Sequence, residues 1–268
     1  RSLTQEELWE GTGNRESFKK SFFSKESIIL WTIKTHSQVR KKYESYMADP
    51  KFSHIKFVRL RNDLEVESYL ANLNYNWQPF SPMEVKGALG SLNCQWSIAG
   101  GWAIDLFLGR QMRNHDDIDV IVKREDQFQI QEALRGWELW VADPPGTLKP
   151  WRKAEFIGKG LQDIWCRPSK NDPWKIQIML YDVDDGDWLF KRDESIRRKL
   201  EEVLITSKEG YSILAPEVQL LYKSKSLRDK DNTDFGNALS EMNAEQKMWL
   251  KKSLTTVYGT DHRWIDRL

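Results

Sequence analysis

The chain has 268 residues, with 41 basic and 40 acidic side chains and a formal charge of +1 at pH 7. A charge so close to zero excludes bulk electrostatic attraction to nucleic acid as the basis of function, although a local basic patch remains open. The length allows one large domain or two smaller ones that each bury a core, and we expect two.

Cysteine and histidine usage limits the kinds of metal site. The two cysteines, Cys94 and Cys166, form neither a disulfide framework nor a zinc set, and the four histidines have no metal-ligand spacing. We therefore expect any metal to be held mainly by oxygen atoms. No apolar run approaches the roughly 18 residues of a membrane span, and no charged-then-apolar leader is found. We expect no membrane span, no signal peptide and a cytoplasmic location, while the oligomeric state is not indicated.

The first 76 residues predict an α/β region. The expected elements are a strand at 27–31, a helix at 35–47, a second strand at 55–60 and a second helix at 64–73. The pieces ELWEGTGNRESF, SIILWTIKTHSQVRKKYE and HIKFVRLRNDLEVESYL resemble the back half of an adenylate-kinase-like P-loop protein. The chain contains no GxxxxGK[ST] loop, so the resemblance implies a partial kinase-like region without catalysis of its own.

A linker is predicted at 77–82, between this first region, 1–76, and a second domain, 83–268. The surrounding sequence NYNWQPFSP has two prolines, two asparagines and no apolar periodicity. Ser81, Pro82 and Glu84 fit an N-cap, a proline at the first helical position and the glutamate of a capping box. They predict a helix that continues to about residue 92.

The main functional motif lies in residues 96–122. An apolar strand at 96–99 stops at Gly100 and Gly101, and a glycine pair between strand and helix lets backbone N–H groups approach a phosphate. Beyond a short helix, strand alternation in DDIDVIV puts Asp117 and Asp119 on one face. Two carboxylates this close repel each other unless a cation lies between them, and Mg²⁺ prefers such oxygen ligands. We expect Asp117 and Asp119 to hold Mg²⁺.

The rest of the second domain predicts a small sheet followed by helices. The expected elements are a helix at 124–135, a strand at 137–141, a loop at 143–150, strands at 162–166 and 175–180, an acidic hairpin turn at 181–186, and three helices from residue 215 onward.

These motifs resemble the nucleotidyltransferase superfamily, whose signature is an apolar residue, a glycine pair, a spacer and Asp-x-Asp. The segments GGWAIDLFLGR and RNHDDIDV are most similar to the aminoglycoside 2″-adenylyltransferase and lincosamide nucleotidyltransferase branch, in which a spacer as long as the 15 residues here is usual. The resemblance implies an α+β nucleotidyltransferase fold with a C-terminal helical segment. It also implies transfer of AMP, or another nucleoside monophosphate, from a nucleoside triphosphate to a hydroxyl of a small polar acceptor.

The resemblance suggests further site residues. Gly100 and Gly101 would lay backbone N–H groups along the phosphates, and Arg113 or His115 would add a charge-assisted contact. The segment PEVQLLYKSKSLRDKDNTDF is similar to the C-terminal part of the same group, which implies that lysines such as Lys223 and Lys230 reach the nucleotide. A helix with solvent-exposed charge pairs four residues apart is the other interpretation of these lysines.

The superfamily's third carboxylate has no direct counterpart. In register with the motif, its position falls on Gln177, which cannot ionise and cannot act as a general base. Asp182, at the end of the same predicted strand, is the expected base. Two other functions stay open: an AMP transferase that acts on protein or RNA, and a nucleotide-binding protein without catalysis.

Overall fold

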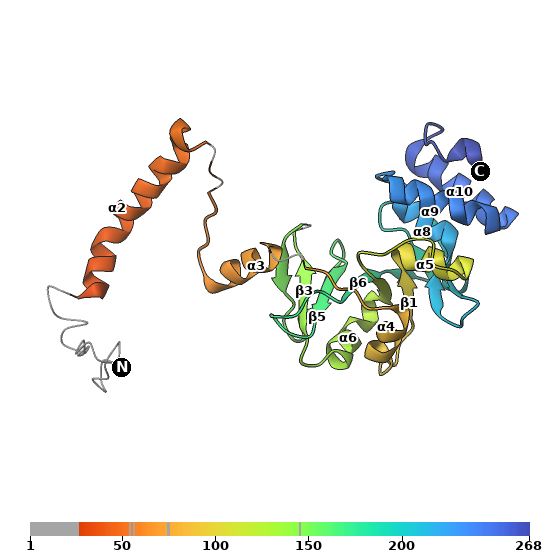
Figure 1. Cartoon of the computed structure of the whole chain (residues 1–268), viewed down its shortest axis with the longest axis horizontal. Coiled ribbons are helices and arrows are strands. Elements are labelled where there is room, and N and C mark those ends of the chain that lie inside the picture. The colour runs from red at the N-terminus through yellow and green to blue at the C-terminus, as the bar shows by residue number, and fades with distance from the viewer. Residues whose placement is uncertain (1–26, 54, 56, 74–75, 145) are drawn as a thin grey trace. The chain divides into compact units, whose positions relative to one another are not determined.

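The computed structural model describes residues 27–53, 55, 57–73, 76–144 and 146–268, and it divides the chain into two compact units, 1–60 and 61–268 (Figure 1). No helix of the described part is both long enough and apolar enough to cross a membrane. Cys94 and Cys166, which are both among the described residues, are free thiols.

The described part of the first unit is helical and contains no strand. It holds α2 (Ile28–Ala48) and a short 3-10 helix (Pro50–Phe52). The strand predicted at 27–31 is wrong, because Ser27 caps α2 by accepting the N–H of Leu30 at 3.2 Å. A short apolar run fits either a helix or a strand, and the N-cap serine decides for the helix. Residues 57–60 belong to no strand either, and the segment ELWEGTGNRESF lies outside the described residues.

The second unit begins earlier than the sequence predicted. Helix α3 (Asp63–Leu73), expected within the kinase-like region, lies against strand β4 (Leu148–Pro150) of the large sheet. The segment expected to be a linker, 77–82, is itself bound to this unit. Gln78 donates its N–H to the carbonyl of Trp174 at 3.1 Å. The helix predicted from Ser81 is confirmed as α4 (Pro82–Leu89), with both hydrogen bonds of the capping box formed.

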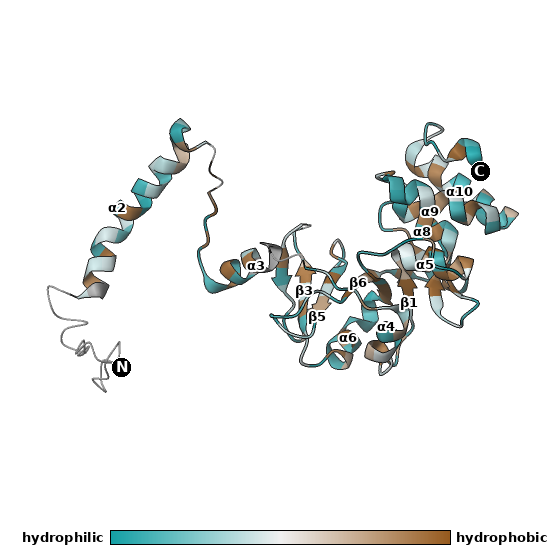
Figure 2. Cartoon of the chain, in the orientation of Figure 1, coloured by the Kyte–Doolittle hydropathy of each residue, from teal (hydrophilic) through white to brown (hydrophobic). Residues whose placement is uncertain are grey.

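An eight-stranded mixed sheet forms the centre of the second unit, in the order β10-β11-β1-β2-β6-β5-β3-β4. Figure 2 shows its strands, β1, β3 and β5 among them, largely in hydrophobic colours. Its strands are β1 (Trp96–Ala99), β2 (Asp119–Lys123), β3 (Glu138–Ala142), β4, β5 (Asp163–Arg167), β6 (Ile176–Tyr181), β10 (Leu204–Thr206) and β11 (Ser212–Leu214). The smaller sheet is made of β7 (Val183–Asp184), β8 (Asp187–Leu189) and β9 (Arg197–Lys199), so the acidic turn is a hairpin, as predicted.

The helices of the second unit cover the sheet in two groups. Helix α5 (Gly100–Leu108) follows β1 directly. After it come η2 (Arg124–Asp126), α6 (Gln127–Ala133), α7 (Leu200–Val203), α8 (Pro216–Lys223), α9 (Asp229–Glu241), α10 (Ala244–Tyr258) and η3 (Ile265–Arg267). Val120 and Val122 of β2 pack in one buried cluster with residues of α4 and α6. Ile121 points the other way and packs in a second cluster with residues of α5, α8, α9 and α10. Because side chains alternate along a strand, Asp119 lies on the same face as Ile121.

Candidate active site

The glycine turn and the second strand meet in direct contact. Gly100 adopts a φ of +67°, and a Cβ atom placed on it would lie 2.1 Å from Oδ2 of Asp119. Strands β1 and β2 pair antiparallel with Ala99 opposite Asp119, which explains why the turn comes so close to the carboxylate. Only glycine combines this backbone conformation with this approach. The glycine motif and the acidic motif therefore form one site.

The two glycines have different roles. The N–H of Gly100 donates to Oε1 of Gln219 at 2.7 Å, so it is not available to a phosphate as the sequence had suggested. Gly101 lies in the first turn of α5, whose N–H groups have no partner within the helix. A Cβ atom on Gly101 would lie 2.3 Å from Nη2 of Arg113 and 2.5 Å from Nδ1 of His115. The structure thus places both predicted phosphate contacts beside the start of α5.

Asp117 and Asp119 interact electrostatically across this site. Burial and the charge of Asp117 raise the pKa of Asp119 to about 7, although the Lys223 ammonium lowers it. The charges of Asp163 and Lys230 act on the same carboxyl group in opposite directions. The carboxyl group of Asp119 is therefore costly to ionise until a cation joins it.

Positive charge is held at the site by buried acids of α9. Lys223, at the end of α8, contacts Asp231 at 3.2 Å and Asp234 at 2.9 Å. Arg113 makes two hydrogen bonds of 3.0 Å to the same Asp234. The Arg113 guanidinium and the Lys223 ammonium hold the pKa of Asp234 below its usual range in spite of its burial. The sequence could not show that Lys223 and Arg113 share one carboxylate.

His115 and Lys230, the remaining predicted nucleotide contacts, also lie near the glycine and acidic motifs. The Nε2 atom of His115 donates to Oδ2 of Asp105 at 2.7 Å, and its ring lies against that of Trp102. Its buried Nδ1 finds no hydrogen-bond partner within the described part of the chain. Lys230 lies 3.7 Å from Asp116 and keeps about a third of its side chain exposed, at 34%. These pairs of Lys223 and Lys230 are not between residues four positions apart on one helix, as the charge-pair interpretation expected.

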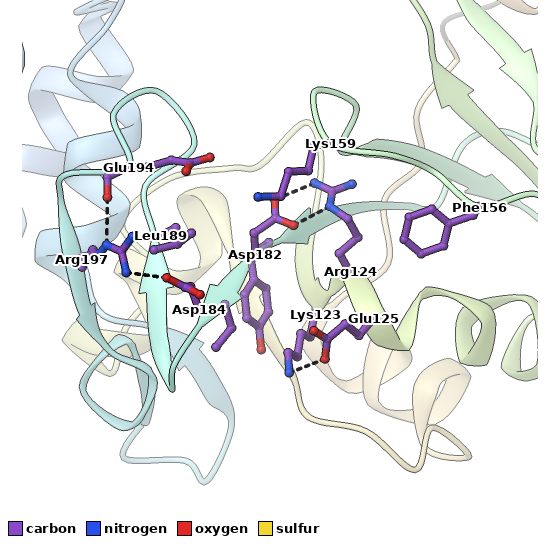
Figure 3. A pocket seen from close by; sticks show the side chains of 12 residues that line it. Lys123, Arg124, Glu125, Phe156, Lys159, Asp182, Asp184, Leu189, Glu194 and Arg197 are labelled. Atoms are coloured by element: carbon purple, nitrogen blue, oxygen red, sulfur yellow. Dashed lines mark hydrogen bonds and ion pairs between the residues drawn. The ribbon is translucent and has the colours of Figure 1, made fainter.

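Asp182 is not placed with these residues. Strands β2 and β6 run parallel with Asp119 opposite Gln177, so Asp182 lies five positions further along, roughly 16 Å away along the strand. It lines a separate cavity of about 400 Å³, where the Arg124 guanidinium binds both carboxylate oxygens at 2.6 and 3.0 Å (Figure 3). The prediction of Asp182 as the general base is corrected by this geometry.

Sequence reasoning missed Asp163. It is the first residue of β5, and its Oδ1 accepts a hydrogen bond from Nε2 of Gln177 at 3.1 Å. The alternation of DIWCR placed Asp163 and Trp165 on one face, but only the register between β5 and β6 shows that this face carries Gln177.

The donor atoms fit a hard divalent cation. Among the residues that the structure describes, no group of three or more histidine, cysteine, aspartate or glutamate side chains is placed to hold a metal. Mg²⁺ is commonly bound by one or two carboxylates together with water and substrate phosphates, so a site with fewer than three such side chains is compatible with a divalent ion.

Residues 82–237, more than half of the chain, match the family model described as aminoglycoside-2''-adenylyltransferase. The chain belongs to this family. The match begins at α4 and continues into α9, so it includes every residue of the site described above. Members of this family are nucleotidyltransferases, and the resemblance found in the sequence is confirmed. No curated protein matches the chain.

Three solved structures show the kind of likeness to this chain that was found. The antibiotic-resistance factor ANT(2'')-Ia is 17% identical, with 66% of this chain and 91% of that chain covered and a TM-score of 0.45. The lincosamide antibiotic adenylyltransferase LnuA, bound to lincomycin, is 16% identical, with 62% and 100% covered and a TM-score of 0.44. An antigenic nucleotidyltransferase-like protein from Paracoccidioides brasiliensis is 16% identical, with 70% and 94% covered and a TM-score of 0.37. The assignment to the family rests on the sequence match and not on these likenesses.

Proposed function

We propose that the chain uses Mg²⁺ to transfer AMP, or another nucleoside monophosphate, from a nucleoside triphosphate to a hydroxyl of a small polar acceptor of the aminoglycoside or lincosamide kind. The observation that carries this proposal is the close approach of Asp119 to Gly100, which brings the glycine turn and an acidic side chain together in one site. The family match over 82–237 supports the same chemistry.

The acid pair and the turn have complementary roles in this proposal. Asp117 and Asp119 would hold the divalent ion, which when bound neutralises charge on the triphosphate and positions the pyrophosphate leaving group. The N–H of Gly101 and its neighbours at the start of α5 would donate to phosphate oxygens, because a helix N-terminus favours anions. The turn and the acids thus bind the two oppositely charged parts of one metal–nucleotide complex.

Two basic residues of the site are held in position by one buried acid. Asp234 fixes both Lys223 and Arg113, which limits the freedom that these long side chains lose on binding an anion. Lys230 remains partly exposed and is the more adaptable contact. We assign Lys223 and Lys230 to the triphosphate because both lie close enough to Asp119 to lower its pKa.

The test is direct. The full chain is incubated with Mg-ATP and a panel of aminoglycosides and lincosamides, and the products are measured by mass. An acceptor heavier by one AMP is expected, and Asp119→Asn should form none. A product only on added protein or RNA would instead support a macromolecule-modifying transferase. Binding of ATP with no pyrophosphate released in any mixture would support the non-catalytic alternative.

A further inference from the structure

Asp163 lies on the same face of the large sheet as Asp119, one of the two acids proposed to bind the metal. Gln177 of β6 pairs with Asp119 of β2 on one side and with Trp165 of β5 on the other. Because side chains two apart on a strand share a face, Asp163 projects to the side of Gln177 and Asp119. Strand β6 lies between β5 and β2, so two strand spacings of roughly 4.8 Å separate the backbones of β5 and β2.

Gln177 binds the carboxylate of Asp163. The amide Nε2 donates to Oδ1 at 3.1 Å, so the residue at the superfamily's acid position orients an acid from the neighbouring strand. This hydrogen bond uses one lone pair of Oδ1, and a carboxylate has further acceptor sites. The amide therefore fixes the direction of the carboxylate without removing its ability to accept a proton.

The charged surroundings of Asp163 come from three elements besides its own strand. Lys191, in the segment after β8, is the nearest cation, Asp119 lies on β2, and the buried hydroxyl of Tyr222 lies on α8. Burial raises the pKa of Asp163 even though Lys191 and hydrogen bonds from the side chains of Gln177 and Gln162 lower it. A carboxyl group with a raised pKa is a stronger base than one exposed to water.

Two other roles for Asp163 fit the structure less well. No group of three metal-ligand side chains is found among the described residues, so we do not assign Asp163 to the metal together with Asp117 and Asp119. A purely structural acid would be paired as Asp182 is, with two hydrogen bonds to Arg124. Asp163 instead has the uncharged side chains of Gln177 and Gln162 as hydrogen-bond partners, and it faces the side on which the phosphates are expected.

We propose that Asp163 is the general base of the transfer, supplied by β5 in place of a third acid on β6, an inference that rests on the proposed function. The acceptor hydroxyl gives its proton to the carboxylate of Asp163. The hydroxyl oxygen forms a bond to the α-phosphorus, and the bond between that phosphorus and the bridging oxygen of pyrophosphate breaks. Pyrophosphate leaves with the electron pair of the broken bond, and Gln177 keeps the base oriented throughout.

The test compares Asp163→Asn with Asp182→Asn in the full chain, using Mg-ATP and an acceptor that the wild type modifies. Asp163→Asn keeps the size of the side chain and should lower kcat by roughly 10²- to 10⁴-fold, while the Kd for Mg-ATP changes by less than about twofold. The control variant Asp182→Asn should keep kcat within about threefold of the wild type, because residue 182 lies outside the site. Its activity is measured at a temperature below the melting temperature of this variant. Asp163→Glu should recover part of the lost rate.

A pH profile separates a base from a structural residue. Wild-type kcat should fall as the pH drops through the pKa of Asp163, and Asp163→Asn should lack this acid limb. The inference is overturned if Asp163→Asn keeps kcat near that of the wild type, or if its loss lies entirely in nucleotide affinity. A wild type that binds Mg-ATP but modifies no acceptor would overturn the proposed function, and the base assignment with it.

Discussion

Replacing Gly100 with alanine should disable the site through a measurable displacement of one carboxylate. The new Cβ atom would lie 2.1 Å from Oδ2 of Asp119, whereas ordinary contact begins at 3.4 Å, so the carboxylate must retreat by about 1.3 Å. A misplacement of about 1 Å in a reacting constellation costs roughly 10²-fold in rate, and we expect kcat/KM to fall by at least that factor. The left-handed φ of +67° adds about 1–2 kcal/mol of destabilisation.

Gly136→Ala is the matched control. Gly136 has a φ of +87° and no atom within 4 Å of an added Cβ, so its replacement introduces the backbone strain without the contact. Urea unfolding should show a loss of about 1 kcal/mol or more in both variants. Steady-state kinetics should show near wild-type activity for Gly136→Ala alone. Equal activity in the two variants, or a Gly100→Ala enzyme within about threefold of the wild type, would refute the steric argument.

Three further predictions test the site and its boundaries. Asp117→Asn should lower transfer by roughly 10³-fold or more, since metal stabilisation is worth several kcal/mol, with an unchanged melting midpoint as the control for folding. Burial raises the pKa of Asp119 to about 7, so the stability that its protonated form contributes is lost as the pH rises through that value. The metal-free protein should therefore have a lower melting temperature at about pH 8 than at about pH 6. Added Mg²⁺ should remove most of this difference in melting temperature. Equal melting temperatures at the two pH values without metal would contradict the reasoning. Deleting residues 1–60 should leave a second unit that melts cooperatively. Deleting residues 1–76 also removes α3, which packs against β4, and should lower the melting temperature of the remaining unit. Calorimetry on the two deletion variants measures this difference.

Local signals in the sequence were enough to predict the centre of the second unit. The capping box at Ser81, the apolar run before Gly100 and the alternation around Asp119 each specify their own element through contacts within a few residues. These elements follow one another closely in the chain. For this reason the meeting of the glycine turn with the acidic strand could be predicted from the sequence alone.

The errors came from features that depend on contacts distant in sequence. Asp182 looked close to the site because it ends the strand that carries Gln177, but the parallel register with β2 places it toward the opposite end. Asp163 is 14 positions from Gln177 in the chain, and only the pairing of β5 with β6 brings the two together. Strand register depends on which neighbours a strand finds in the fold, and the sequence of one strand does not specify it.

The first unit shows a different limit. An apolar run such as that at 28–31 has the same composition in a helix as in a buried strand, and no partner strand exists for it among the described residues of this unit. A serine cap and a long basic segment after it favour the helix that the structure contains.

The most direct measurement counts both products of the reaction in one tube. Full-length protein, Mg-ATP and an acceptor are mixed, and pyrophosphate and AMP-acceptor are quantified over time for the wild type and for Asp119→Asn. We predict equal amounts of the two products in the wild type and neither product in the variant. Undiminished transfer by Asp119→Asn, or no pyrophosphate from a wild type that binds Mg-ATP, would contradict the assignment of nucleotidyl transfer to the site at Gly100 and Asp119.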